Sequence, residues 1–304
     1  MGMEESCMRR RKNALLLLFI FVIIAILNGC SIDNKSNSLN VEEGIKIAVS
    51  IVPQETFVKA VGGDKINIIT MIPPGKSPEN FAPTPDIMEQ FSDANLYFTI
   101  GVPTEVASIV PKIDDFNKDV KIVDMAEEVS KVYDDIKFES GGRDPHIWLS
   151  PKRAKVMIQI IARELSAIDP SNESYYQTNA ENYVKELDKL DTDIKESLSS
   201  LKKKTFICYH PAFGYFADDY NLEMLAIENE GKEATIEDLQ KIIDFAKDEE
   251  IKVVFYQAEI DSKQSKVIAS EIDGKAEMVE PLSPEYINNL EKMAETFKKA
   301  MEVK

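Results

Sequence analysis

A long helical pattern in the middle of the chain limits what the protein can fold into more than any other feature. Between Ser171 and Leu201 the sequence contains no glycine or proline, and apolar residues recur every three or four positions. This period is typical of one amphipathic α-helix, and at 1.5 Å per residue such a helix is roughly 40 Å long. A coiled-coil seam is the competing interpretation, but the apolar positions keep no clean heptad register. We therefore predict a single helix over 171–202 that packs along the rest of the molecule.

Short apolar runs alternate with helical patterns on both sides of this helix, as in α/β proteins. The candidate strands are 45–52, 66–72, 96–100 and 121–123 before the helix, and 205–209, 223–227, 252–256 and 277–279 after it. We expect two α/β lobes, 45–170 and 203–304, each with a mostly parallel sheet and flanking helices, joined by one long, rigid spine helix.

Three helix starts are marked by a hydroxyl side chain followed by proline. A serine or threonine at this position caps the first turn, and proline fits the first helical position. The pattern predicts helices that begin after Thr84, Ser150 and Ser283.

The first 29 residues have the pattern of an export signal. A basic cluster at 9–12 precedes the apolar run 14–27, which is shorter than the roughly 20 residues that span a bilayer. The run ends in Leu-Asn-Gly before Cys30 and resembles a lipobox, so cleavage would leave a lipidated Cys30. An uncleaved anchor helix is the alternative, and both interpretations place the rest of the chain outside the cytoplasm. Translation starts at Met1 or at Met8, which directly precedes the basic cluster.

The segment after Cys30 is polar and rich in serine and asparagine. Such a composition favours a flexible linker, so we expect 30–44 to be a tether that attaches the protein to the outer face of the cytoplasmic membrane. The formal net charge of the whole chain is −17, which excludes nucleic acid as a partner and favours cations in general. We expect the protein to be a monomer.

The two histidines of the chain are its most informative candidates for chemistry. His146 precedes the predicted helix start at Ser150, and His210 follows the predicted strand 205–209. Ligands of open α/β sheets bind at the carboxyl ends of strands. A single histidine is more often structural. One histidine near a strand end in each lobe, however, favours a shared role in binding one ligand. Two neutral imidazoles supply half of a tetrahedral site for a borderline cation such as zinc.

Carboxylates at other strand ends are the candidates for the remaining ligands. Glu280 directly follows the predicted strand 277–279, and Glu79 and Asn80 lie in a proline-rich loop after the strand 66–72. A stiff loop holds a ligand with little loss of entropy on binding. Most glutamates are solvated surface side chains, so both assignments are hypotheses at this point.

Four stretches of the chain resemble the metal-specific substrate-binding proteins of ABC importers, the zinc and manganese family called cluster A-I. They are the proline-glycine loop that begins at Pro73 and ends in APTPD (82–86), DPHIWLSP (144–151), HPAFGYFADDYNL (210–222) and EPLSPEYINNLEKM (280–293). The similarity extends from about Ile45 to the C-terminus. It implies two lobes joined by a long helix, with the metal between the lobes. It also implies a binding protein without enzymatic activity or catalytic cofactor, whose partners are an importer permease and its ATPase.

The resemblance also implies a set of metal ligands. His146 and His210 match two ligand histidines, Glu280 replaces the commoner aspartate, and Glu79 stands where zinc-binding relatives usually carry histidine. Asn80 or a water molecule could take the place of Glu79. A carboxylate in place of an imidazole makes the site harder and reduces its preference for Zn²⁺ over Mn²⁺ and Fe²⁺. We still expect Zn²⁺ as the preferred ion, with Mn²⁺ and Fe²⁺ as the alternatives.

Two aspartates are candidates for orienting the ligands. Asp144 or Asp219 could accept the remaining N–H of a ligand histidine and so fix its tautomer.

Proteins of other classes remain as alternatives. A binding protein for a metal chelate, a siderophore or a corrinoid, needs a wide cleft with arginine or aromatic rings, and the chain after Cys30 has only Arg143, Arg153 and Arg163. An extracytoplasmic metallohydrolase needs a general base, and the sequence contains neither HExxH nor GxSxG. A role as a surface adhesin would leave the metal-binding chemistry unchanged.

Overall fold

Two parallel four-stranded sheets organise residues 44–229, 231–260 and 263–302, the part of the chain that the computed structural model describes. The strand orders are β2-β1-β3-β4 and β6-β5-β7-β8. The strands are β1 (Ile45–Val49), β2 (Ile66–Thr70), β3 (Leu96–Thr99), β4 (Lys121–Asp124), β5 (Thr205–Cys208), β6 (Glu223–Ala226), β7 (Val253–Gln257) and β8 (Lys275–Val279). All eight predicted strands are confirmed, and so is the α/β fold with two mostly parallel sheets. Because every pairing is parallel, the carboxyl ends of neighbouring strands lie at the same edge of each sheet.

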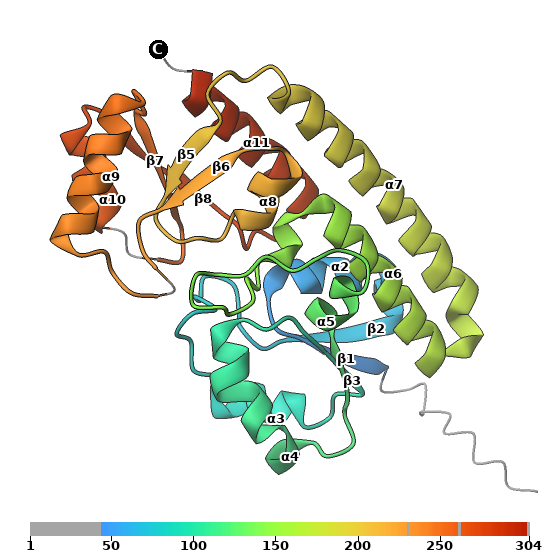
Figure 1. Cartoon of the computed structure of the whole chain (residues 1–304). Helices are drawn as coiled ribbons and strands as arrows, with labels where there is room; N and C mark the ends of the chain where they lie inside the picture. Colours follow the sequence, from blue (N-terminus) through green and yellow to red (C-terminus); the bar gives the residue numbers. More distant parts are fainter. Residues whose placement is uncertain (1–43, 230, 261–262, 303–304) are drawn as a thin grey trace, which may run out of the picture. The chain divides into compact units, whose positions relative to one another are not determined.

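Helices flank both sheets (Figure 1). They are α2 (Val52–Gly62), α3 (Pro85–Phe91), α4 (Ile113–Phe116), α5 (Met125–Ser130), α6 (Pro151–Ile168), α7 (Glu173–Leu198), α8 (Gly214–Asp219), α9 (Ile236–Asp248), α10 (Lys263–Glu271) and α11 (Tyr286–Glu302). The predicted starts of α3 and α6 are confirmed, because the Thr84 and Ser150 hydroxyls accept hydrogen bonds from backbone N–H groups of the first turn. The third predicted start is wrong. Ser283 Oγ accepts from Glu285 N within a turn, and the helix begins only at Tyr286.

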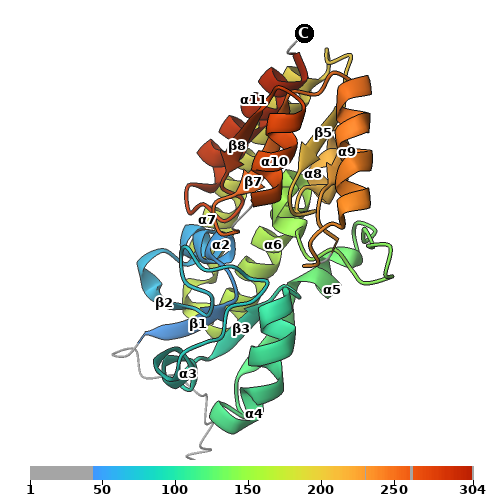
Figure 2. The same cartoon turned by 90° about the vertical axis from the view of Figure 1, so that its left-hand side faces the viewer.

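The long helix α7 is confirmed, and at 1.5 Å per residue it measures roughly 39 Å. A turn of 3-10 helix, Pro170–Asn172, precedes it. Its apolar stripe is buried and packs on α2 and α6 of the first half and on α11 of the second half. Figures 1 and 2 show α7 running alongside both sheets. The buried residues of the stripe are Tyr176, Ala180, Leu187, Leu190, Ile194 and Leu198.

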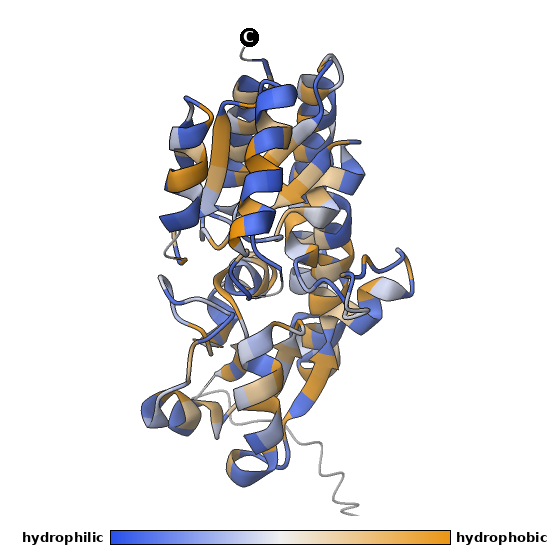
Figure 3. Cartoon of the chain, turned by 60° about the vertical axis from the view of Figure 1, so that its left-hand side comes forward, coloured by the Kyte–Doolittle hydropathy of each residue, from blue (hydrophilic) through white to orange (hydrophobic). Residues whose placement is uncertain are grey.

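The largest hydrophobic core contains residues from both halves of the chain. Figure 3 shows hydrophobic residues in the strands and on the inner sides of the helices, with hydrophilic residues on the outer turns. In the second half the core is centred on Phe297 of α11, which is fully buried. Its ring contacts four other phenylalanines, with centroid distances of 4.6 to 5.6 Å, namely Phe206, Phe213, Phe216 and Phe255.

The predicted membrane attachment concerns residues outside the described part of the chain. The signal peptide over 1–29, the lipidation site Cys30 and the tether up to residue 43 all lie there. Among the residues that the structure does describe, no helix is both long enough and apolar enough to cross a membrane.

Candidate metal centre

The side chains of two histidines and one glutamate come together from three loops of the chain. One ligand atom each from Glu79, His146 and His210 lies within 4.8 Å of the other two. The two imidazole Nε2 atoms are 3.1 Å apart, and His210 Nε2 lies 3.4 Å from Glu79 Oε1. Around a tetrahedral ion with metal–nitrogen bonds of 2.0–2.1 Å, neighbouring ligand atoms are roughly 3.3–3.4 Å apart. The Nε2–Nε2 and Nε2–Oε1 separations are therefore close to the spacing of neighbouring ligands on one small cation, and the third pair of atoms lies within 4.8 Å.

Both imidazole rings are held by buried carboxylates. His146 Nδ1 lies 2.7 Å from Asp144 Oδ1, and His210 Nδ1 is in close contact with Glu228 Oε1. An ionised carboxylate only accepts hydrogen bonds, so each neutral ring carries its proton on Nδ1 and has a lone pair on Nε2. The two lone pairs face each other in a buried site, where the histidines are only 4% and 5% exposed. A cation between the two Nε2 atoms removes this repulsion.

Asp144 fixes the position of His146 through the backbone as well as through the ring. Asp144 Oδ1 also accepts from His146 N at 2.9 Å, and the Asp144 carbonyl accepts from the Tyr215 hydroxyl at 3.0 Å. A Cβ atom at Gly214 would lie 2.7 Å from Asp144 Oδ2, so a residue without a side chain is required there. The DPH and HPAFG motifs therefore pack directly against each other.

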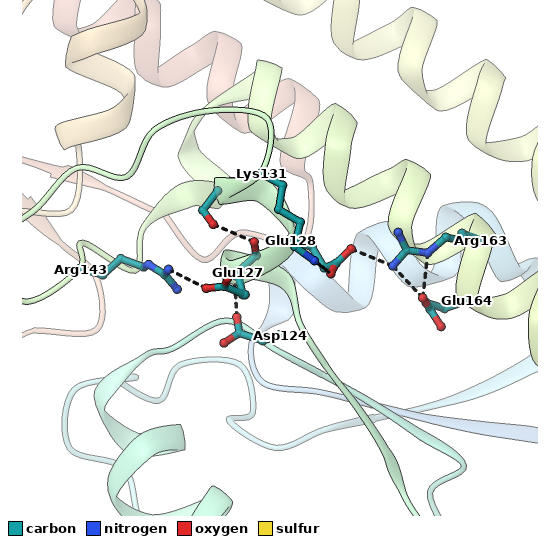
Figure 4. A network of polar contacts seen from close by, with 8 residues as sticks. Asp124, Glu127, Glu128, Lys131, Arg143, Arg163 and Glu164 are labelled. Atoms are coloured by element: carbon teal, nitrogen blue, oxygen red, sulfur yellow. Dashed lines mark hydrogen bonds and ion pairs between the residues drawn. The ribbon is translucent and has the colours of Figure 1, made fainter.

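A network of ion pairs anchors the segment before Asp144 (Figure 4). Arg143 pairs with Glu127 of α5 at 3.2 Å, and Asp124 caps the same helix by accepting from Glu127 N. Arg163 of α6 pairs with Glu128 at 3.0 Å and so links α6 to α5. Such partly exposed pairs contribute little free energy singly. Together they tie the residues that precede His146 to two helices.

The parallel pairing of β5 and β6 brings His210 and Glu228 together. His210 follows the end of β5 and Glu228 follows the end of β6, and Glu228 N donates to the carbonyl of Tyr209 at 2.9 Å. Glu228 was not predicted from the sequence. The sequence indicates Glu228 only by its position just after the predicted strand 223–227. This position points to His210 only if the strands 205–209 and 223–227 are known to be neighbours.

The proline-rich loop places Glu79 opposite the histidines. The loop is tied down by Thr104, whose backbone N donates to Pro78 O at 2.8 Å and whose hydroxyl donates to Phe81 O at 3.1 Å. The Glu79 side chain is 20% exposed, so it lies at the edge of the buried site. Asn80, the alternative ligand, is exposed to solvent.

The structure does not bring Glu280 into the group of possible ligand atoms. Val279, the last residue of β8, is buried, and Glu280 is exposed because successive side chains of a strand point to opposite faces. The next residue, Pro281, does line the site, and its carbonyl accepts from Trp148 Nε1 at 2.9 Å. Glu280 therefore lies at the expected strand end with its side chain in solvent.

Asp219 also lies away from both imidazoles. It accepts from Ser150 Oγ at 2.6 Å and from Arg153 Nη1 at 3.2 Å. Burial raises the pKa of the Asp219 carboxyl, against the opposing effect of these partners and of Lys152. Of the two aspartates considered for orienting a histidine, the structure places Asp144 against a ring and Asp219 against the start of α6.

A small cavity lies beside the three ligand atoms. Its volume is about 20 Å³, which is enough for roughly one water-sized body. Besides the three residues, Trp148 and the end of β7 line it. Gln257 Oε1 and Glu259 Oε2 lie at this end, both buried and without a hydrogen-bond partner among the described residues. Burial also raises the pKa of the Glu259 carboxyl. Neither residue was predicted from the sequence.

The chain is similar to metal-uptake proteins over most of its length. A protein-family profile described as "Zinc-uptake complex component A periplasmic" matches residues 47–300. The high-affinity zinc uptake system protein ZnuA of Bacillus subtilis is 28% identical over 274 residues, with 86% of this chain and 85% of that protein covered. The manganese ABC transporter substrate-binding lipoprotein PsaA of Streptococcus mitis is 27% identical over 271 residues, with 86% of each covered. A crystal structure of ZnuA superposes with a TM-score of 0.80 at 32% identity, covering 85% of this chain and all of that one.

Proposed function

The chain belongs to the family of zinc-uptake complex component A proteins, and from this premise we propose that it captures one divalent metal ion and delivers it to an ABC importer. The partners are the permease and the ATPase of that importer. The metal is the transported cargo, and the protein acts by binding, without catalysis. One relative is named for zinc and another for manganese.

The observation that supports this function best is the pair of facing Nε2 atoms 3.1 Å apart. Because each Nδ1 is bound to a carboxylate, both lone pairs are available to one ion. We assign His146, His210 and Glu79 as its ligands. Three protein ligands leave at least one coordination position for water or another side chain. Glu280 would reach the ion only if its exposed side chain turned inward.

The ligand types favour a transition metal over Mg²⁺ or Ca²⁺, which prefer sites made of oxygen atoms. Two imidazoles suit Zn²⁺, while the Glu79 carboxylate in place of a third makes the site harder and improves it for Mn²⁺ and Fe²⁺. We propose Zn²⁺ as the preferred cargo, with Mn²⁺ and Fe²⁺ as weaker ones.

The size of the cavity argues against a metal chelate as cargo. A volume of about 20 Å³ accepts an ion but neither a siderophore nor a corrinoid. Calorimetric titration of the purified protein with Zn²⁺, Mn²⁺ and Fe²⁺, and with a ferric siderophore and cobalamin, separates the two functions. We expect the protein to bind one equivalent of the bare ion. We expect it to bind neither the ferric siderophore nor cobalamin. Binding of a chelate in the absence of ion binding would refute the proposed function.

Attachment to the membrane is part of the proposal. Several relatives are named lipoproteins, and Cys30 follows a lipobox-like sequence. We infer that Cys30 carries the lipid and that the protein is held at the outer face of the cytoplasmic membrane. Mass spectrometry of the N-terminal peptide tests this assignment, since an unmodified Cys30 in the membrane fraction would contradict it.

Glu228 is expected to strengthen metal binding through His210. The Glu228→Gln variant keeps the size of the side chain but removes the negative charge that holds the Nδ1 proton and makes Nε2 more basic. Loss of such a partner typically lowers metal affinity by about 10–100-fold, which a competition titration with a chelating dye measures. Glu223→Gln, at the exposed start of β6, the strand that precedes Glu228, is the matched control. An unchanged affinity in Glu228→Gln would contradict the role of Glu228.

A further inference from the structure

We propose that Thr104, anchored by the buried Glu105 beside it, is a positioning residue of the metal site and determines how well the site binds Mn²⁺ relative to Zn²⁺. The inference rests on the proposed function, because it takes Glu79 as a ligand of the transported ion. Thr104 is not itself a ligand in this assignment. It holds the loop that carries Glu79.

The loop that carries Glu79 depends on other parts of the molecule for its position. Residues 73–84, between β2 and α3, form neither a helix nor a strand. Within the loop, Ser77 Oγ accepts from Glu79 N at 3.3 Å, and the Ser77 carbonyl accepts from Phe81 N at 3.2 Å. These bonds shape the turn around Glu79 but do not attach it to the sheet. Contacts from outside the loop therefore decide where the Glu79 carboxylate lies.

Thr104 binds the loop on both sides of Glu79. Its backbone N–H donates to the Pro78 carbonyl at 2.8 Å, and its hydroxyl donates to the Phe81 carbonyl at 3.1 Å. Thr104 is only 2% exposed, so its hydroxyl has little access to water as an alternative partner. One buried residue thus fixes the backbone one position before and two positions after Glu79.

The buried carboxylate of Glu105 fixes Thr104 in turn. Its oxygens accept from Ile100 N and Gly101 N, each at 2.8 Å, and Oε2 also accepts from Ser50 Oγ. A carboxylate can accept several hydrogen bonds at once. Ile100 follows β3 and Ser50 follows β1, the two central strands of the first sheet. Thr104 is therefore held, through its neighbour, at the carboxyl ends of both central strands.

The backbone that follows Thr104 has an uncommon form. Residues Glu105–Ile109 make a turn of π-helix, which is rare in proteins and occurs frequently at functional sites. The uncommon backbone thus begins at the residue that anchors Thr104. This position supports a functional constraint on the segment that holds the Glu79 loop.

The position of the loop matters more for manganese than for zinc. Glu79 supplies an oxygen ligand, and its Oε1 atom lies 3.4 Å from His210 Nε2. Carboxylate oxygens suit Mn²⁺, whereas the imidazoles of His146 and His210 suit Zn²⁺. A loop that is already held in its binding conformation loses less entropy when the ion binds. Loosening the loop should therefore weaken Mn²⁺ binding more than Zn²⁺ binding.

Thr104→Val tests the assignment, with Thr99→Val as the matched control. Valine keeps the shape of threonine but cannot donate a hydrogen bond to the Phe81 carbonyl. Thr99 is also buried in the first sheet, and its hydroxyl donates to the Val123 carbonyl of β4 at 3.4 Å. Competition titrations of the purified proteins with a chelating dye measure the dissociation constants for Mn²⁺ and Zn²⁺.

The expected result is a change in the ratio of the two affinities. Because one hydrogen bond contributes a factor of about 10 or less to an equilibrium constant, Thr104→Val should weaken Mn²⁺ binding about 5–10-fold and Zn²⁺ binding about 3-fold or less. Thr104→Ala, which leaves room for water beside the Phe81 carbonyl, should shift the ratio in the same direction. Thr104→Ser, which keeps the hydroxyl, and Thr99→Val should bind both ions as the unmodified protein does.

A double-mutant cycle shows whether Thr104 acts through Glu79. If it does, Thr104→Val has no further effect on the affinity for either ion in a Glu79→Ala background. An undiminished effect in that background would overturn the assignment. An unchanged affinity ratio in Thr104→Val would overturn it as well, and so would an equal change of the ratio in Thr99→Val.

Hydrogen exchange of the metal-free proteins, followed by mass spectrometry, is the second measurement. The loop 73–84 should exchange faster in Thr104→Val than in the unmodified protein and in Thr99→Val. Equal exchange of this loop in all three proteins would overturn the positioning role. Failure of the unmodified protein to bind either ion would overturn the inference together with the proposed function. An unchanged affinity ratio in a protein that binds metal overturns the positioning role alone.

Discussion

Replacing both histidines with alanine is expected to leave the protein without bound metal. The His146→Ala/His210→Ala variant lacks both nitrogen ligands that we propose and keeps, of the three assigned ligands, only Glu79, which is partly exposed. We assign each of the two as a direct ligand, so the combined loss should exceed the roughly 10–100-fold that an outer partner contributes. Elemental analysis after equilibration with Zn²⁺ and gel filtration measures the result. We expect about one equivalent in the unmodified protein and none in the variant.

A second variant distinguishes the loss of metal ligands from unfolding of the protein. Alanine removes the ring N–H that the buried carboxylates of Asp144 and Glu228 each accept, which destabilises the protein. The His146→Gln/His210→Gln variant offers amide N–H groups to the same carboxylates but does not replace the imidazole ligands. It should be folded, as judged by circular dichroism, and free of metal. One equivalent of zinc retained by this folded variant would refute the assignment of the histidines.

The variant Phe297→Ala is expected to lose about 3–5 kcal/mol of the free energy of unfolding. Phe297 is fully buried and packs against the rings of Phe206, Phe213, Phe216 and Phe255. Its truncation removes the ring contacts that α11 makes with Phe206 of β5 and Phe255 of β7, and it leaves a cavity between the remaining rings. Urea unfolding of the metal-free protein, followed by circular dichroism, measures the loss.

The control for this prediction is Phe245→Ala on α9, where the side chain is 39% exposed. Substitutions at such positions usually change stability by about 0.5 kcal/mol or less. Phe297 does not line the metal cavity, so its variant should still bind zinc under native conditions. Equal stabilities of the two alanine variants would show that the aromatic cluster does not hold α11 in place.

Local patterns predicted most of the fold. The eight strands were visible as apolar runs, and α7 was visible because its stripe from Tyr176 to Leu198 is uninterrupted by glycine or proline. The order of the strands in each sheet was not predictable, because it depends on contacts between distant segments. The start of α11 was misplaced because a serine before proline also forms a simple turn, as Ser283 does here.

The candidate site was predictable only in part. His146 and His210 stood out because the chain has no other histidine. Glu228 and Glu259 were missed because the chain is rich in acidic residues, and most glutamates are solvated. Only the parallel pairing of β5 with β6 and β7 shows which strand ends adjoin His210. The sequence placed Glu280 at a suitable strand end, but the direction of its side chain follows from the burial of Val279.

The X-ray absorption spectrum of the zinc-loaded protein tests the central claim most directly. The structure predicts one zinc with two imidazole nitrogens at about 2.0–2.1 Å and carboxylate oxygens at about 2.0–2.2 Å. The multiple-scattering features of two histidine rings should be present in the unmodified protein and absent in His146→Gln/His210→Gln. A zinc spectrum without imidazole scattering in the unmodified protein would contradict the account, because the ion would then be bound somewhere other than between His146 and His210.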